Sequence, residues 1–264
     1  MKKKLLGIII MLAVLISALV CTVIITNAED APPELAIKSG AVTISDSVFL
    51  TMKVEASGVE FSDVKLLVWD EPRAEYLLGT EKYTVNFSGE TDDTSGKLRG
   101  IYHFRAMSAK MMADNFYFVA YANVEGEDCY SPLIKYSALQ YAYNKLGKTG
   151  TVTTDENLET LLYEMLDYGA AAQVYLNHNA DRPANADWYQ VKLTEGKLFD
   201  GTKSGLFLPG DTVVLTAPEA NESGVPFAYW QNSEGAELPP TENIHIPWVK
   251  RTKLSPLCLK ELHQ

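Results

Sequence analysis

Cysteine is scarce in this chain of 264 residues, which has three, at positions 21, 129 and 258. No CxxC pair occurs, so the sequence predicts neither a zinc ribbon nor a dithiol redox motif. The four histidines are widely spaced and form no HxxxH or HExxH pair, so a histidine metal site is not expected either. These histidines are His103, His178, His245 and His263.

Sequence motifs of nucleophilic catalysis are also missing. No GxSxG elbow or SxxK motif stands in a suitable place, and Lys203-Ser204-Gly205 is interpreted as a turn. Asp70 and Glu71 could mimic the carboxylate pair of a glycosidase, but Pro72 follows them and indicates a turn. Adjacent residues on a strand also point to opposite faces. We therefore expect no catalytic residues.

Two further groups favour structure over ligand binding. The acidic loop with Glu90, Asp92 and Asp93 lacks the spacing of an EF-hand, so a solvated hairpin loop is the better interpretation than a calcium site. The four tryptophans could form a sugar-stacking platform, but they are spread over separate elements, which favours packing in cores or between modules. They are Trp69, Trp188, Trp230 and Trp248. We expect no metal and no cofactor.

Basic charge is low. The chain has 23 basic and 34 acidic side chains, a net charge of −11. Removal of residues 1–28 takes away three lysines and no acid, leaving 20 basic side chains against 34 acidic ones. This balance argues against nucleic acid and anionic membrane surfaces as partners.

The N-terminus is typical of an export signal. Lys2–Lys4 form a basic start, Leu5–Ile25 is almost wholly apolar, and Ala28 offers a small residue for cleavage. We expect a signal peptide at 1–28 and a secreted or cell-surface protein. The alternative is an uncleaved anchor, because the apolar run is long enough to span a bilayer. In that case the membrane is contacted through this segment.

After a short polar linker the hydrophobic pattern changes to a period of two, which predicts strands. Turn signals separate the predicted strands, and this spacing is typical of a small antiparallel sandwich. The predicted strands lie within Val42–Val54 and at Val64–Trp69, Lys82–Phe87, Gly100–Arg105 and Phe116–Ala122. Ser108–Asp114 is expected to form a helical turn.

Two helices are expected next. Ser137, with Gln140 three residues on, predicts the start of a helix at Ala138–Leu146, and Gly147 stands where a C-cap would. The longer helix, 157–176, is expected to begin with a capping box of Thr153 and Glu156. Its apolar face is predicted to contain Leu158, Leu161, Leu162, Met165, Leu166, Gly169, Ala172 and Leu176. The opposite face is predicted to contain Glu159, Glu164, Asp167 and Gln173.

Small residues at Gly169–Ala172 are expected to allow a close approach by another backbone. The two helices should form a hairpin that packs on the sandwich or between modules, because neither can bury its apolar stripe alone.

The remainder reads as a linker at 181–187 followed by a second β-rich module. Strands are predicted at Gln190–Thr194, Thr212–Ala217 and Phe227–Asn232, with turns at Gly196, Gly201, Gly205 and Gly210. After Leu238 the alternation stops, so we expect an irregular tail at 239–264 and poor order at Asn243–Gln264. A truncated or frameshifted gene end and a native variable tail both fit this change.

Two resemblances emerge from particular motifs. The Ser-Ala-Lys-Met turn at 108–111, Tyr136-Ser137 and Tyr-Gly-Ala-Ala-Ala-Gln at 168–173 resemble a module of exported proteins of gut Firmicutes, covering about 35–187. That module has no assigned activity or catalytic residues, so the resemblance implies no site. Val191–Leu238 resembles the internalin-type B repeat of bacterial surfaces, through motifs that include Gly210-Asp211, the strand Val214–Pro218 and Phe227–Trp230.

The expected fold is mainly β with a helical hairpin (α+β). Its modules are a β-sandwich with the hairpin at 35–180, a partial surface repeat at 188–238 and the tail. The resemblances imply a Gram-positive cell-surface protein with a non-catalytic structural or adhesive role, binding an unknown protein or glycan. The alternative is a carbohydrate-active accessory protein or enzyme whose site the sequence does not reveal.

Overall fold

The computed structural model describes residues 33–94, 96–146, 155–220, 227–231, 237–238, 243–245 and 257–262. Its fold is mainly β, with 40% strand, antiparallel sheets and two helices, which confirms the expected class. The predicted signal peptide and cleavage site lie outside the described residues. In the described part of the chain, no helix is long and apolar enough to cross a membrane.

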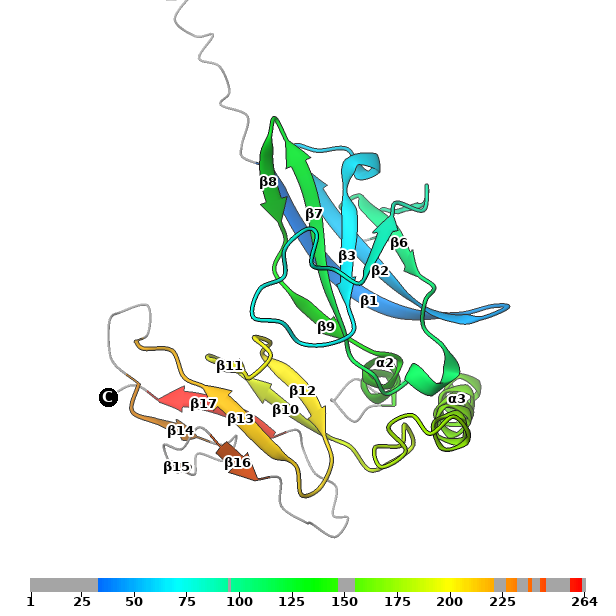
Figure 1. Ribbon diagram of the computed structural model, residues 1–264, viewed down its shortest axis with the longest axis vertical. Helices are drawn as coiled ribbons and strands as arrows, with labels where there is room; N and C mark the ends of the chain where they lie inside the picture. The colour runs from blue at the N-terminus through cyan, green and yellow to red at the C-terminus, as the bar shows by residue number, and fades with distance from the viewer. Residues whose placement is uncertain are drawn as a thin grey trace, which may run out of the picture.

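The N-terminal module is a sandwich of two sheets (Figure 1). The first sheet has the order β1-β2-β6-β5, with bounds Glu34–Ile44, Val48–Ser57, Arg99–Phe104 and Thr91–Asp92. The second has the order β4-β3-β7-β8, with bounds Tyr83–Asn86, Lys65–Trp69, Phe116–Val124 and Glu127–Tyr130, and β9 (Ile134–Tyr136) also pairs with β7. The predicted antiparallel sandwich is confirmed.

The core lies between the two sheets and follows from the alternation of the strands. On β6, Tyr102 and Phe104 point inward and are buried, while the residues between them face outward. Inward side chains of β2 and β3 complete this core, and they are Leu50, Met52, Val54, Leu66 and Val68. The sequence did not predict β5, β8 and β9, because β5 and β9 have only two and three residues and β8 (Glu-Asp-Cys-Tyr) has no alternation of apolar and polar residues.

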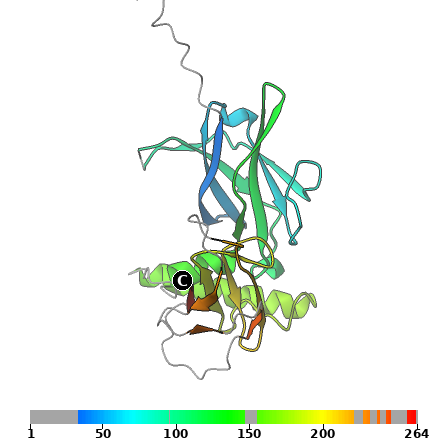
Figure 2. The same cartoon turned by 90° about the vertical axis from the view of Figure 1, so that its left-hand side faces the viewer.

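Both predicted helices are present, at the end of the sandwich that faces the second β module (Figures 1 and 2). Helix α2 spans Ala138–Lys145, and its predicted cap is confirmed because the Ser137 hydroxyl accepts a hydrogen bond from the backbone N–H of Gln140. Helix α3 spans Glu156–Tyr175. Its predicted capping box is wrong, because the carboxylate of Asp155 accepts the bonds from the first turn. Gly147 and Thr153 lie outside the described residues.

The buried face of α3 is centred on Leu162, Met165 and Leu166, as predicted. Leu161, however, is 45% exposed, and Gln173, expected on the polar face, is fully buried. Gln173 follows Leu162 by about three helical turns, so both side chains lie on one face. The predicted apolar face therefore wrongly included Leu161 and wrongly excluded Gln173.

The small residue Gly169 does permit a close approach, but by a side chain instead of a backbone. A methyl group at this position would lie 3.0 Å from the sulfur of Met112, which follows the 3-10 turn η2 (Ala109–Met111). This contact packs α3 against the predicted helical turn at the end of the sandwich.

The second β module contains a five-stranded sheet and a three-stranded one. The first has the order β12-β10-β17-β14-β15, with bounds Ser204–Phe207, Tyr189–Leu193, Leu257–Leu262, Tyr229–Gln231 and Glu237–Leu238. The second has the order β11-β13-β16, with bounds Lys197–Leu198, Thr212–Thr216 and Asn243–His245. Its core contains Val191, Leu193, Leu198, Phe207, Val213, Leu215 and Trp230.

Two expectations about this module are wrong. Gly205 lies within β12, not in a turn. The irregular tail expected at 239–264 contributes β16 and β17, and β17 pairs in parallel with β10 and antiparallel with β14. These pairings join segments far apart in the sequence, so local alternation carries little trace of them. The rest of the expected tail lies outside the described residues.

Candidate binding cleft at the junction of the two β modules

A cleft with a volume of about 550 Å³ lies where the sandwich, the end of α3 and the second β module meet. We call it the junction cleft. Loops of the sandwich, the start of α2, the segment after α3 and the second module all contribute to its walls. Its lining includes Asp70, Lys82, Lys110, Asp114, Asn115, Tyr117, His178, Asn179, Arg182, Trp188, Phe199 and Leu206.

The wall after α3 is shaped by two asparagines and one glutamine. Asn177 and Asn179 adopt left-handed backbone angles (φ 49° and 47°), which asparagine tolerates better than most residues, and they turn the chain back along the helix. The buried side chain of Gln173 donates to the carbonyls of Asn179 and Arg182 and accepts from the N–H of Ala184. The stretch 181–187, expected to be a linker, is thus anchored to α3 at its start.

His178 and Asp114 form a hydrogen-bonded pair in the cleft. The Nε2 atom of His178 lies 2.7 Å from Oδ2 of Asp114, and Nδ2 of Asn179 donates to Oδ1 of the same carboxylate at 3.0 Å. Asp114 follows the turn η2, while His178 and Asn179 follow α3. The carboxylate therefore ties the end of the sandwich to the end of the helix and fixes the imidazole.

Arg182 connects the same segment to the second module. Its guanidinium makes two bonds to the carboxylate of Asp211, at 2.9 and 2.7 Å, and lies 5.1 Å from the ring centre of Trp188. The guanidinium lowers the pKa of the Asp211 carboxyl, against the opposing effect of burial. Trp188 is itself buried and donates its indole N–H to the carbonyl of Pro183.

Beside the cleft, Asp200 forms a buried ion pair across the junction. Its carboxylate is 2.7 Å from the ammonium of Lys135 on β9, and it accepts from the Tyr117 hydroxyl on β7 and from the hydroxyl and N–H of Thr202. Burial raises the pKa of Asp200, but Lys135 and the Thr202 donors outweigh it, so the net pKa lies below its usual range. Burial lowers the pKa of Lys135, against the attraction of Asp200.

The charged groups of the cleft are largely neutralised by one another. Lys82 pairs with Asp70, as Arg182 pairs with Asp211. At the rim, the ring of Phe199 is 59% exposed. The arrangement thus offers hydrogen-bonding groups and an apolar ring, held in place by contacts between segments, with little unbalanced charge.

Three residues that the sequence analysis considered as possible site residues lie together in this cleft. Asp70, His178 and Trp188 all line the cleft. Asp70 and Glu71 lie in a bend after β3, and they pair with Lys82 and Arg73 respectively. Local sequence gave no signal for most of the other lining residues, because they come from separate segments and are polar or aromatic types common on any surface.

Two of the other tryptophans lie in hydrophobic clusters. Trp69 belongs to a cluster on the outer side of β3 and β7, and Trp230 to the core of the second module. Packing was therefore the correct interpretation for these two, while Trp248 lies outside the described residues. Ser204 and Gly205 belong to β12 and form no nucleophile elbow.

His103 was expected to face solvent, but its side chain is only 17% exposed. Its ring lies against Phe49 and bonds to the Thr51 hydroxyl. Cys129 is a free thiol. Among the described residues, no group of three or more histidine, cysteine or acidic side chains could hold a metal ion.

No protein-family model, curated protein or solved structure matches the chain.

Proposed function

We propose that this chain is an exported, cell-surface protein with a non-catalytic, adhesive role, and that the junction cleft binds an uncharged part of a glycan. The observation that supports the ligand class is the internal charge balance of the cleft. Asp70 and Asp211 neutralise Lys82 and Arg182, and the lining residues Lys110 and Asp114 have opposite charges, so hydrogen bonds and ring contacts are left as the main interactions for a ligand. Sugars offer hydroxyl groups for the former and apolar ring faces for the latter.

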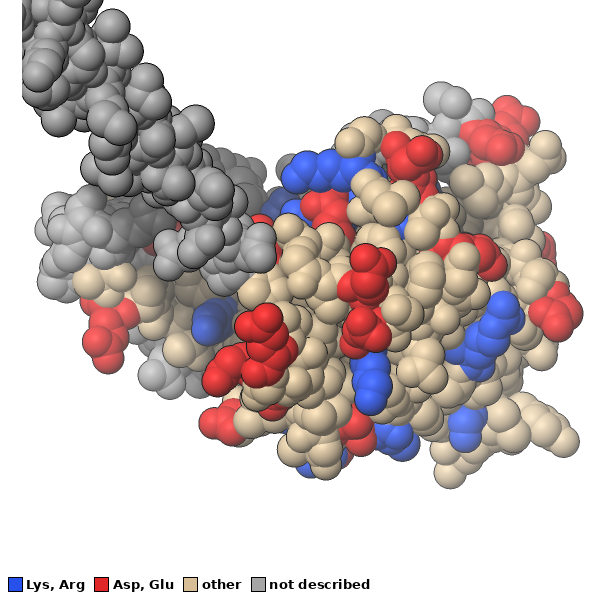
Figure 3. Space-filling view, turned by 90° about the horizontal axis from the view of Figure 1, so that it is seen from above, with Lys and Arg blue, Asp and Glu red and all other residues tan. Residues whose placement is uncertain are grey.

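Export and surface location rest on the sequence. The basic start, apolar run and Ala28 favour export, and the resemblances to a Firmicutes module and a surface repeat favour a Gram-positive cell surface. The solvated acidic surface fits this setting. On the face seen in Figure 3, acidic side chains are scattered with basic ones between them.

A glycan array probed with the full chain tests the proposal. Phe199→Ala removes an exposed ring from the cleft, and Tyr168→Ala removes a similarly exposed ring from α3, away from the cleft. We expect Phe199→Ala to weaken binding about tenfold or more, and Tyr168→Ala to leave it unchanged. Equal binding by wild type and Phe199→Ala would contradict the placement of the ligand.

A carbohydrate-active enzyme is the second candidate, favoured by the His178–Asp114 pair in the cleft. A carboxylate that fixes an imidazole is also the arrangement of a general base. The described hydrogen bonds of His178 include none to a serine, threonine or cysteine hydroxyl or thiol. If glycans bound on the array are also cleaved, and His178→Ala abolishes cleavage while binding persists, the enzyme replaces the adhesin.

A further inference from the structure

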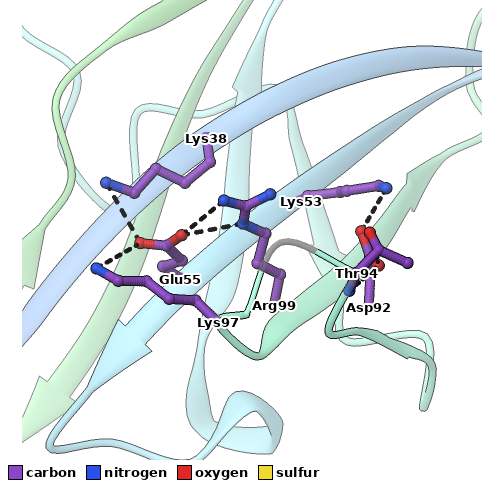
Figure 4. Close-up of polar contacts among 7 residues, drawn as sticks. All are labelled: Lys38, Lys53, Glu55, Asp92, Thr94, Lys97 and Arg99. Atoms are coloured by element: carbon purple, nitrogen blue, oxygen red, sulfur yellow. Dashed lines mark hydrogen bonds and ion pairs between the residues drawn. The ribbon is translucent and has the colours of Figure 1, made fainter.

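A cluster of basic side chains lies on the outer face of the sheet β1-β2-β6-β5, away from the junction cleft. Three cations converge on the carboxylate of Glu55 (Figure 4). Lys38 and Lys97 lie 3.3 and 3.8 Å from Oε2, and the guanidinium of Arg99 contacts Oε1 at 2.9 and 3.0 Å. Next to them, Lys53 pairs with Asp92.

The cluster is basic in a chain that is acidic. Its four cations face two carboxylates, which leaves two positive charges in excess, whereas the chain as a whole carries −11. The side chain of Glu55 is 16% exposed and that of Lys97 is 73% exposed, so the carboxylate is recessed behind the cations. Burial raises the pKa of Glu55, but Arg99 and Lys38 bring the net pKa below its usual range, so Glu55 is ionised at neutral pH.

The outward side of β6 borders this cluster. Within β6, Arg99, Ile101 and His103 face outward, because the alternate residues of this strand are buried. Lys97 precedes this strand and Arg105 follows it. The strand itself, from Arg99 to Phe104, extends for about 17 Å at about 3.4 Å per residue. Glu90 lies near His103, and Asp46 interacts with Arg105, so the positive excess belongs to the cluster around Glu55.

A thin, linear polyanion fits this small cluster of cations better than a broad surface does. A bilayer with anionic headgroups would also meet the acidic remainder of the protein, which repels it, whereas a polysaccharide chain laid across the cluster contacts mainly its four cations. We propose that this sheet face binds an acidic polysaccharide, whose sulfate or carboxylate groups contact Lys38, Lys97 and Arg99. This site is separate from the junction cleft and does not depend on the function proposed for it.

The test measures binding of the full chain to heparin, which supplies sulfate, and to polygalacturonate, which supplies carboxylate, at low and physiological salt. We expect binding to at least one of them, weakened by salt. Lys38→Gln with Lys97→Gln removes two exposed cations and should weaken binding about five- to tenfold. Lys192→Gln, an exposed lysine of β10, should change nothing.

A variant with the opposite expected effect separates ligand binding from a purely structural role. Glu55→Gln removes the recessed negative charge and leaves its three cations, so it should bind the polyanion more tightly and with a steeper salt dependence. Thermal unfolding of each variant confirms that it is folded at the assay temperature. The proposal is overturned if neither polyanion binds at low salt, or if the lysine variant binds like wild type. Weaker binding by Glu55→Gln, or equally tight binding to anionic vesicles or duplex DNA, overturns it too.

Discussion

Loss of the ammonium of Lys135 should destabilise the junction more than loss of any surface charge. In Lys135→Met the carboxylate of Asp200, which is 1% exposed, remains buried without its cation. Removal of one partner of a buried pair costs about 3–5 kcal/mol. Asp200 keeps its bonds to the Tyr117 hydroxyl and to Thr202, so the lower end of that range, about 3 kcal/mol, is expected for this variant.

The reverse variant should cost more. Asp200→Asn leaves the ammonium of Lys135, 8% exposed, beside a neutral amide. It also replaces the charged acceptor of the hydrogen bonds from Tyr117 and Thr202 by a neutral one. The double variant, Lys135→Met with Asp200→Asn, leaves neither charge buried, so its cost should fall below the sum of the single variants by about 1–3 kcal/mol.

Urea unfolding followed by tryptophan fluorescence measures these costs, because Trp69 and Trp230 report on the sandwich and the second module respectively. The matched control is Lys82→Met, which breaks a more exposed pair with Asp70 at the same cleft and should cost at most about 1 kcal/mol. If Lys135→Met costs no more than Lys82→Met, or if the single variants are additive, the buried pair does not hold the junction as argued.

Two further predictions concern a turn and acid stability. Gly196→Ala should be more destabilising than Gly201→Ala by about 1–3 kcal/mol in urea melts. Both have positive φ, but a methyl group at Gly196 meets Trp230 and the Thr216 carbonyl at 2.6 and 2.8 Å, while nothing lies within 4 Å at Gly201. The lowered pKa values of Asp200 and Asp211 contribute stability that is present above their unfolded pKa of about 3.9 and is lost as pH falls through their folded pKa values. Unfolding midpoints between pH 6 and pH 2.5 should therefore fall more steeply below pH 4 in wild type than in Asp211→Asn, and equal slopes would contradict this.

Features that depend on near neighbours in the sequence could be predicted. The strand β6 was visible because its inward residues, Tyr102 and Phe104, alternate with polar ones. The start of α2 was visible because Ser137 and the N–H it caps are three residues apart. Such signals are local, so composition and period were sufficient to give the class of fold.

Features that depend on partners far away in the sequence could not be predicted. The partners of Asp200 on the sandwich, Lys135 and Tyr117, lie 65 and 83 residues away, and no pattern at one end indicates the other. Gln173 looked like a surface residue because its type is polar, yet its amide satisfies three backbone groups of the returning chain. The strand β17 likewise depends on β10 and β14 for its pairing.

The same long-range contacts determine how the proposed cleft works. The walls of the cleft belong to both modules, so its shape exists only while the junction is closed by Asp200 with Lys135 and by Arg182 with Asp211. A ligand that touches both walls binds the closed junction and not the open one, so it must stabilise the junction by mass action. Conversely, closure before binding means that the ligand does not have to supply the free energy of ordering the walls. The buried ion pair outside the cleft is thus coupled to affinity inside it, without contacting the ligand.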